Sequence, residues 1–197
     1  TTFDTNNDVF ETINLVGFTS TAAPTIVTGA YALGATGGNL TINANTLTAL
    51  EVVTITGTDS VTPMDIKTGA ASDTVTLGTK ADTLDAGAGN DIITGTSGSN
   101  VIDAGAGNDT ITLGSGVENI SAGAGNDTIV TGSNIANTDT IDGGDGVDTL
   151  TTTTAISNPS VMANVSNIEV ISPIFVAAAD SAIVADGAMG GATTFSL

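Results

Sequence analysis

The sequence predicts an all-β chain that winds into a parallel β-roll, a right-handed β-solenoid with a β-rich N-terminal region and a C-terminal cap. A nine-residue period runs through residues 68–151, and a repeat of fixed period is the signature of a solenoid. One apolar residue recurs at the same place in each period, which is enough to line a narrow core. Hydrophobic residues make up 40% of the 197-residue chain, so it can bury a core despite its acidity.

Three copies mark the period most clearly, because they read Ala-Gly-Ala-Gly-Asn-Asp from Ala86, Ala104 and Ala122, at an even spacing of two periods. Weaker copies lie halfway between them. The sixth position of each copy is acidic or Asn: Asp73, Asp82, Asp91, Asn100, Asp109, Glu118, Asp127, Asp139 and Asp148. An apolar residue follows two places later: Val75, Leu84, Ile93, Ile102, Ile111, Ile120, Ile129, Ile141 and Leu150. The phase slips by three positions through 135–137.

The regions on either side of residues 68–151 lack the period. Residues 1–67 alternate apolar and polar side chains at 10–15, 39–43 and 50–55, which predicts strands, and their continuity with the solenoid is left open. Residues 152–197 are predicted to form a β cap, because a solenoid needs its last coil covered. Glu11, Glu51 and Glu169 are interpreted as exposed residues on strand faces.

Each copy contains a turn followed by a short strand. In residues 86–94 the glycines allow a tight turn or a positive φ, and Ile93 then faces inward while its neighbours face outward. Two copies make one coil, so the coils are expected to form two parallel sheets back to back. The resulting core is only about one apolar side chain per strand wide. Such a core hardly offsets roughly 1–2 kcal/mol of backbone entropy per residue, so a further source of stability is expected.

These repeats resemble the RTX nonapeptide G-G-x-G-x-D-x-U-x, in which U is a large apolar residue and the turn binds calcium. The resemblance implies calcium held between one turn and the next on the same edge. The three best copies have Ala at the first position, and the copies ending at Asp82, Asn100 and Glu118 are degenerate. Calcium accepts carboxylate and backbone carbonyl oxygens. The implied ligands therefore include the sixth-position residues and the turn glycines, Gly87, Gly89, Gly105, Gly107, Gly123, Gly125, Gly144 and Gly146.

A coil of two copies divides the sixth-position residues between two edges. The first edge holds Asp73, Asp91, Asp109, Asp127 and Asp148, and the second holds Asp82, Asn100, Glu118 and Asp139. Stacked carboxylates repel one another, and a hard divalent cation removes that repulsion. We expect several calcium ions, mainly on the first edge, with weaker or fewer sites on the second. The alternative is that the side chains only satisfy turn backbone groups. Asp85, Asp103 and Asp142 precede first-edge turns and are interpreted as solvated strand ends or as additional charge.

Composition excludes several classes of function. The net charge is −19, with Lys67 and Lys80 as the two basic residues, so nucleic acid and anionic membrane surfaces are not expected partners. No apolar run is long enough for a transmembrane segment. The chain has no His and no Cys, which removes the usual general base, the usual nucleophile pairs, disulfides and common zinc ligands. We expect a non-enzymatic protein.

Three functions remain open. The Thr-, Ala- and Gly-rich composition resembles that of RTX-containing bacterial surface-layer proteins, which implies a secreted, extracellular protein that self-assembles or attaches to the cell surface with calcium. The second is a C-terminal module of a type I-secreted enzyme, toxin or adhesin, with an uncleaved export signal near residues 180–197. The third, minor alternative is an ice-binding solenoid, because outward threonines repeat as Thr-x-Thr.

Overall fold

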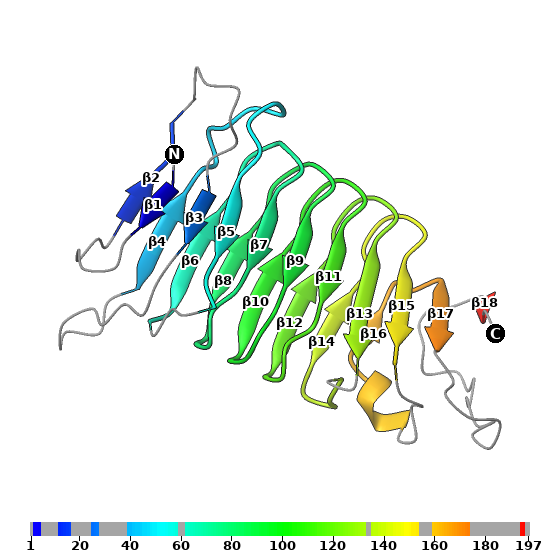
Figure 1. Ribbon diagram of the computed structural model, residues 1–197. Coiled ribbons are helices and arrows are strands. Elements are labelled where there is room, and N and C mark those ends of the chain that lie inside the picture. Colours follow the sequence, from blue (N-terminus) through cyan, green and yellow to red (C-terminus); the bar gives the residue numbers. More distant parts are fainter. Residues whose placement is uncertain are drawn as a thin grey trace.

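The computed structural model describes residues 2–4, 12–16, 25–27, 39–58, 62–132, 135–153, 159–173 and 194–195. In these ranges the chain coils repeatedly and places one strand of each coil in each of two sheets, and the strand pairs are parallel (Figure 1). Sheet A has ten strands in the order β1-β3-β5-β7-β9-β11-β13-β15-β17-β18, and sheet B has eight in the order β16-β14-β12-β10-β8-β6-β4-β2. The predicted all-β parallel solenoid is confirmed.

The strands are short, as expected for a chain that turns every few residues. Those of sheet A are β1 (Thr2–Asp4), β3 (Thr25–Val27), β5 (Thr54–Thr56), β7 (Thr74–Thr76), β9 (Ile92–Thr94), β11 (Thr110–Thr112), β13 (Thr128–Gly132), β15 (Thr149–Thr152), β17 (Val170–Pro173) and β18 (Thr194–Phe195). Those of sheet B are β2 (Thr12–Asn14), β4 (Leu40–Asn43), β6 (Met64–Lys67), β8 (Thr83–Asp85), β10 (Asn100–Asp103), β12 (Glu118–Ser121), β14 (Thr140–Asp142) and β16 (Val165–Ser166). A 3-10 helix, η1, spans Pro159–Met162.

The register between neighbouring coils follows the repeat. Ile93 pairs with Ile111 and Ile111 with Ile129, each exactly two periods further along the chain. The next pair in sheet A, Ile129 with Leu150, has a longer spacing because the chain gains three positions before β14. The gain falls in a connection between sheets, so like residues still stack on like residues.

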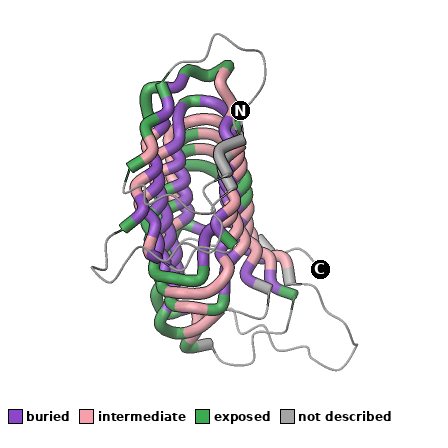
Figure 2. The backbone as a smooth tube through the Cα atoms, turned by 60° about the vertical axis from the view of Figure 1, so that its left-hand side comes forward, coloured by how far each residue is buried: buried purple, intermediate pink, exposed green. Residues whose placement is uncertain are grey.

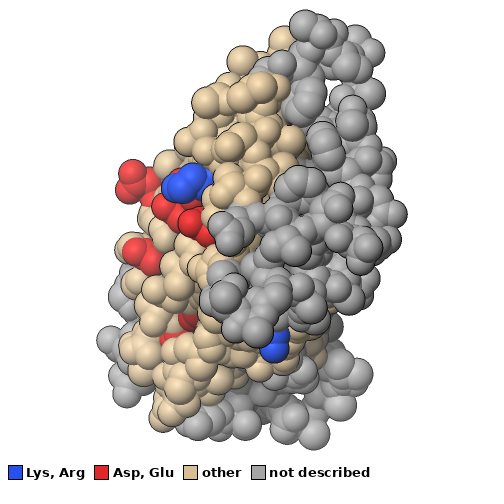
Figure 3. Space-filling view, turned by 90° about the vertical axis from the view of Figure 1, so that its left-hand side faces the viewer, with Lys and Arg blue, Asp and Glu red and all other residues tan. Residues whose placement is uncertain are grey.

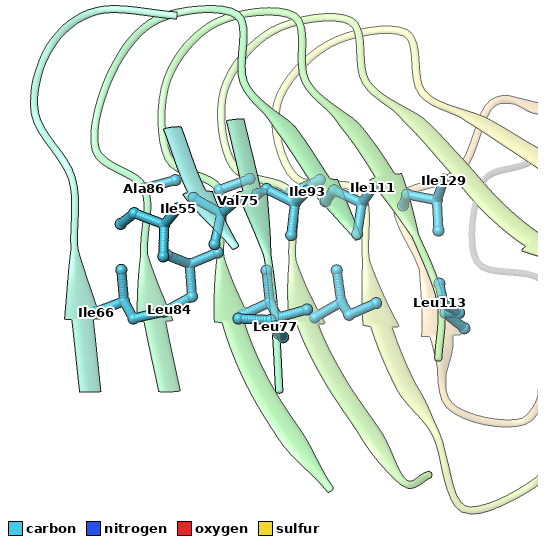
Figure 4. Close-up of a cluster of buried hydrophobic side chains, with 14 of the residues drawn as sticks. Ile55, Ile66, Val75, Leu77, Leu84, Ala86, Ile93, Ile111, Leu113 and Ile129 are labelled. Carbon is cyan, nitrogen blue, oxygen red and sulfur yellow. The ribbon is translucent and has the colours of Figure 1, made fainter. Parts of the chain in front are cut away.

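The core is the double row of apolar side chains that the period predicts. Sheet A contributes Ile55, Val75, Ile93, Ile111, Ile129, Leu150 and Ile171, and sheet B contributes Ile42, Ile66, Leu84, Ile102, Ile120, Ile141 and Val165. Figure 4 shows side chains of the two rows facing each other. Figure 2 shows that buried residues recur in successive coils of the backbone. Along each strand, burial alternates with the two-residue period of side-chain direction. All nine apolar positions named from the sequence are buried.

Strands outside the repeats extend the same two sheets. In sheet B, β2 pairs with β4, β4 with β6 and β6 with β8, so the described strands before the repeats join them without a break in pairing. The alternation at 39–43 corresponds to β4 and that at 10–15 contains β2, but the run at 50–55 overlaps β5 only at its end. At the other end, β16 pairs with β14 and β17 with β15, which adds a coil beyond residue 152.

The outer face of sheet A carries the threonine rows. One row runs through Thr54, Thr74, Ile92, Thr110, Thr128, Thr149 and Val170. Ile92 and Val170 therefore interrupt the row. No helix of the described part of the chain has the length and apolarity needed to span a membrane.

Candidate metal centre

The acidic residues of the first edge are buried, which the sequence analysis did not predict. Asp73, Asp91, Asp109, Asp127 and Asp148 are at most 1% exposed, and each lies just before a strand of sheet A. The carboxylates therefore lie under the turns rather than at their solvent-exposed tips. Burial without compensation penalises a charged carboxylate, so the partners of each oxygen determine what the edge can do.

One oxygen of each carboxylate is used within the protein. The backbone N–H of Asp91 donates to Oδ1 of Asp109 at 2.8 Å, and that of Asp109 donates to Oδ1 of Asp127 at 2.7 Å. The same bond links Asp73 to Asp91 at 2.7 Å and Asp127 to Asp148 at 2.8 Å. A continuous ladder thus runs along the first edge, each carboxylate binding the backbone of the preceding coil. The first-edge side chains therefore satisfy backbone N–H groups, as the alternative in the sequence analysis predicted. These bonds engage only Oδ1 of each carboxylate.

The other oxygen is left without a partner in four successive coils. Oδ2 of Asp91, Asp109, Asp127 and Asp148 is buried and receives no hydrogen bond. Burial raises the pKa of Asp91 to about 7, with smaller contributions from the neighbouring charges of Asp109 and Asp73. Burial likewise raises the pKa of Asp109 to about 6. Asp73 differs, because its Oδ2 accepts a 3.2 Å hydrogen bond from the N–H of Gly69. Buried and unpartnered carboxylate oxygens require an explanation, and an ion is one.

The turn glycines let each first-edge turn lie close to the backbone carbonyls of the turn before it. Gly105 and Gly107 have φ of 98° and 132°, a region that residues with a Cβ avoid. A Cβ on Gly105 would lie 1.9 Å from the carbonyl oxygen of Gly87, and one on Gly107 would lie 1.8 Å from that of Gly89. The same approach recurs in other coils at Gly87, Gly89, Gly123, Gly125, Gly144 and Gly146. Only glycine therefore lets one turn lie this close to the carbonyls of the turn before it.

A second ladder outside the acidic one fixes the spacing of these turns. The N–H of Asn108 donates to Oδ1 of Asn90, and the N–H of Asn126 donates to Oδ1 of Asn108, each at 2.8 Å. Asn126 in turn accepts a hydrogen bond from the N–H of Val147 at 2.8 Å. These asparagines are exposed. Two parallel ladders therefore hold the first-edge turns in register, one buried and acidic, the other exposed and neutral.

The second edge is satisfied differently. Asp82 accepts at Oδ1 from the N–H of Met64 at 2.8 Å and at Oδ2 from the N–H of Gly78 at 2.7 Å. Asp139 accepts at Oδ1 from the N–H of Glu118 at 3.0 Å and at Oδ2 from the N–H of Ala136 at 2.7 Å. Both oxygens of each Asp are thus engaged by backbone donors, one of which lies in the carboxylate's own turn.

The two remaining members of the second edge contact each other. The Asn100 side-chain amide donates to Oε1 of Glu118 at 3.3 Å, and Oδ1 of Asn100 accepts from the N–H of Asp82 at 3.0 Å. Oε2 of Glu118 is buried and unpartnered. Burial raises the pKa of Glu118, while the Asn100 side chain lowers it. The second edge therefore has one free buried oxygen where the first has four in a row.

Acidic residues that precede the first-edge turns have separate roles. Asp85 pairs with Lys67 at 3.1 Å, and both side chains are about half exposed. Such a pair contributes little to stability. Figure 3 shows carboxylates gathered beside a basic side chain on one side of the face in view. Asp142 instead accepts from the N–H of Gly144 at 3.2 Å and from the side-chain amide of Asn167 at 2.7 Å. Asp142 therefore ends β14 with its carboxylate held by two donors.

Glu169 belongs to the first edge and was misinterpreted from the sequence. The N–H of Asp148 donates to its Oε2 at 2.8 Å, so Glu169 continues the ladder by one more coil. The interpretation as an exposed strand residue is wrong. The spacing from Asp127 to Asp148 is repeated from Asp148 to Glu169, and this repetition is the signal that could have identified it. Glu51 also lies outside the strands, between β4 and β5, and its carboxylate accepts from the N–H and the hydroxyl of Thr48. Glu11 lies outside the described residues.

The donors of the first edge fit a hard divalent cation such as calcium. Among the described residues, no three acidic side chains converge on one point. Any such ion must therefore take mixed ligands, a buried carboxylate oxygen together with turn carbonyls, which is the oxygen donor set that calcium prefers. The unpartnered oxygens of Asp91, Asp109, Asp127 and Asp148 supply the carboxylate part of this donor set. On the second edge only Glu118 does.

Comparison with known proteins places this site in a family of repeats. Residues 68–102, 94–129 and 136–152 match the family model of the RTX calcium-binding nonapeptide repeat. The matches include turns of both edges between Gly69 and Asp148, leave out residues 130–135, and end before Glu169. No curated protein and no solved structure matches the chain.

Proposed function

We propose that the RTX calcium-binding repeats of residues 68–152 make this chain a non-enzymatic structural β-roll that folds outside the cell when calcium binds its first edge. One observation carries the proposal: the unpartnered, buried oxygens of Asp91, Asp109, Asp127 and Asp148 in successive coils. Calcium, when bound, supplies the positive charge and the coordination that these oxygens lack. The chain's own part is to present a carboxylate oxygen and turn carbonyls in each coil at a fixed spacing.

Without an ion, the unpartnered oxygens carry a large free-energy cost. Leaving a buried polar group unsatisfied costs roughly 1–3 kcal/mol, and more for a charged group. Four such groups stack along the first edge. Their summed cost is comparable to the whole stability of a typical domain, about 5–15 kcal/mol. The metal-free fold should therefore be marginal or absent, and ion binding is folding free energy.

This dependence supports an extracellular location. Extracellular calcium modules bind with dissociation constants of about 10⁻⁴–10⁻³ M, so they remain largely empty at low calcium. A net charge of −19 adds self-repulsion that opposes compaction before the ion binds. A chain of this kind would stay unfolded where calcium is scarce and fold where it is plentiful.

Within that role we favour a bacterial surface-layer protein. A stack of coils is a rigid body with two flat sheet faces, which suits self-association into an array or attachment to a cell surface. The absence of His and Cys from the sequence supports a non-catalytic role. The alternative, a C-terminal module of a type I-secreted enzyme, toxin or adhesin, shares the calcium-dependent folding but requires no assembly.

A calcium titration of chelator-treated protein tests both parts of the proposal. Circular dichroism should report a gain of β structure as calcium is added, and light scattering recorded in the same titration should rise if the chain assembles. Electron microscopy of the calcium-loaded sample should then show sheets. Folding without a rise in scattering would favour the secreted module. A full β signal and an unchanged melting temperature in chelator would overturn calcium-driven folding itself.

A further inference from the structure

The turn that closes the first edge is shorter than the turns before it. Six positions separate Asp142, the end of β14, from Asp148, but only three separate Ser166, the end of β16, from Glu169. The chain makes this short connection with Asn167 at a φ of 52°, the one non-glycine residue with positive φ among those described. The Asn167 side chain is fixed by its 2.7 Å hydrogen bond to Asp142.

The shortened turn brings its backbone over the last repeat. A Cβ on Gly143 would lie 1.9 Å from the carbonyl oxygen of Asn167 and 2.8 Å from Oδ2 of Asp148. These two oxygens therefore lie close together beside Gly143. The corresponding position in the three preceding coils is Ala86, Ala104 and Ala122, so Gly143 is the member of this series whose missing Cβ lets the Asn167 carbonyl lie this close.

The Asp148 oxygen beside Gly143 is both buried and unsatisfied. Asp148 is 0% exposed, and its Oδ2 receives no hydrogen bond. The Glu169 carboxylate lies next to the backbone of Asp148, whose N–H donates to its Oε2 at 2.8 Å. The negative charges of Asp127, Glu169 and Asp142 all act on Asp148. Oδ2 of Asp148 thus lies beside the Asn167 carbonyl oxygen, in a region of negative charge.

We propose that Asp148, Glu169 and the Asn167 carbonyl form an additional calcium site that closes the first edge beyond the last RTX repeat. This proposal rests on the proposed function, since it assumes that the first edge binds calcium. Two carboxylates and a backbone carbonyl are hard oxygen donors of the kind calcium takes. Because Asn167 and Glu169 immediately precede β17, an ion here would fasten the terminal coil to the repeats.

The competing interpretation is that Glu169 serves only as the hydrogen-bond acceptor for Asp148. The substitution Glu169→Gln separates the two, because a glutamine oxygen can accept the same hydrogen bond but brings no negative charge. Glu51→Gln is the matched control: Glu51 also accepts from a backbone N–H, that of Thr48, and belongs to neither edge.

The experiment counts calcium ions bound to the whole chain by isothermal titration and by equilibrium dialysis with radioactive calcium. Glu169→Gln should bind one ion fewer than the unmodified chain, and Glu51→Gln should bind the same number. In chelator, the β signals of Glu169→Gln and the unmodified chain should agree. An unchanged ion count in Glu169→Gln would overturn the terminal site while leaving the proposed function intact. No calcium binding by the unmodified chain would overturn both.

A crystal structure of the unmodified chain grown with calcium provides a test that needs no variant. Anomalous difference density beside Gly143, within coordinating distance of Asp148 and Glu169, is the expected result. Occupied sites at Asp109 and Asp127 with only water beside Gly143 would overturn the terminal site. This measurement decides the question even if Glu169→Gln fails to fold.

Discussion

The backbone N–H of Asp91 donates a 2.8 Å hydrogen bond to Oδ1 of Asp109 in the next coil, while Oδ2 of Asp109 stays buried without a partner. Each first-edge carboxylate from Asp91 to Asp148 thus has two separate tasks. One oxygen joins its coil to the coil before it, and the other is available to an ion. The same residue therefore contributes to the fold and, under the proposed function, to its dependence on calcium.

Replacing Asp109 by Asn should separate these tasks. Asn100 shows that an asparagine fits such a ladder, since its Oδ1 accepts from the N–H of Asp82. Asp109→Asn should keep the bond to Asp91 and lose the charge that holds the ion. We expect a higher melting temperature in chelator and a smaller rise on adding calcium, by about 2–4 °C for each kcal/mol lost. Thermal unfolding with and without calcium measures both.

The same substitution on the second edge should behave differently. Both oxygens of Asp82 already accept backbone hydrogen bonds, from Met64 and Gly78. Asp82→Asn places an amide NH₂ against one of these donors, so it should cost roughly 1–3 kcal/mol whether or not calcium is present. Chemical denaturation in both conditions checks this. Equal calcium dependence in Asp82→Asn and Asp109→Asn would contradict the distinction between the edges.

Gly107→Ala should prevent the turns from stacking. A Cβ there would lie 1.8 Å from the carbonyl oxygen of Gly89, and the φ of 132° is unsuited to alanine. The backbone strain alone costs about 1–2 kcal/mol, and the clash adds to it. We expect the calcium midpoint of folding to rise at least tenfold. Ala106→Ser is the control, because Ala106 is exposed and pairs with its neighbours through backbone atoms. Wild-type folding of Gly107→Ala would refute the proposed close approach.

Acidity should have opposite effects on the metal-free and calcium-bound protein. Burial raises the pKa of Asp91 to about 7 and that of Asp109 to about 6, above the ordinary value of 3.8. Between the ordinary pKa of 3.8 and the raised values, the folded state binds more protons than the unfolded state. The stability of the metal-free fold therefore falls as pH rises from about 4 to 7. Calcium requires the deprotonated carboxylates, so calcium-dependent stability should rise over the same range. Melting temperatures at pH 5 and pH 8, in chelator and in calcium, test both slopes.

The outer asparagine ladder should contribute to stability without affecting the ion. Asn108→Ala removes the oxygen that accepts from the N–H of Asn126 at 2.8 Å. Because the group is exposed, water replaces the lost partner, and the cost should be about 0.5–1.5 kcal/mol. Calorimetry should show an unchanged number of bound calcium ions. A lower ion count would mean that the ladder positions the ligands and does more than space the turns.

The fold was largely predictable because one signal dominates the sequence. The apolar positions from Val75 to Leu150 recur with the acidic ones, and a period of nine places both at fixed points of a coil. The three-position slip through 135–137 was visible for the same reason, and the structure accommodates it as one longer coil between Ile129 and Leu150. Beyond the repeats the signal weakens, and β6 (Met64–Lys67) was not predicted.

The burial of the carboxylates could not be read from the sequence. The pattern shows that Asp91 and Asp109 share an edge, but it cannot show that each side chain turns inward to bind the preceding backbone. Nor does it distinguish Asp82, with both oxygens bonded, from Asp127, with one free. Glu169 was missed because the short turn before it hides its equivalence to the longer turns of the repeats.

The two edges differ in how much the length of their turns varies. On the first edge, six positions separate the end of β8 from Asp91, and the same count holds before Asp109, Asp127 and Asp148. On the second edge, Val130 to Asp139 spans nine positions where Thr112 to Glu118 spans six. Asp139, at the end of the longer turn, is held by the N–H of Ala136 in that same turn. The first-edge turns are proposed to meet their neighbours across an ion, and we expect that role to prevent their lengthening. We therefore expect the second-edge turns to tolerate insertions, natural or engineered, better than the first-edge turns do.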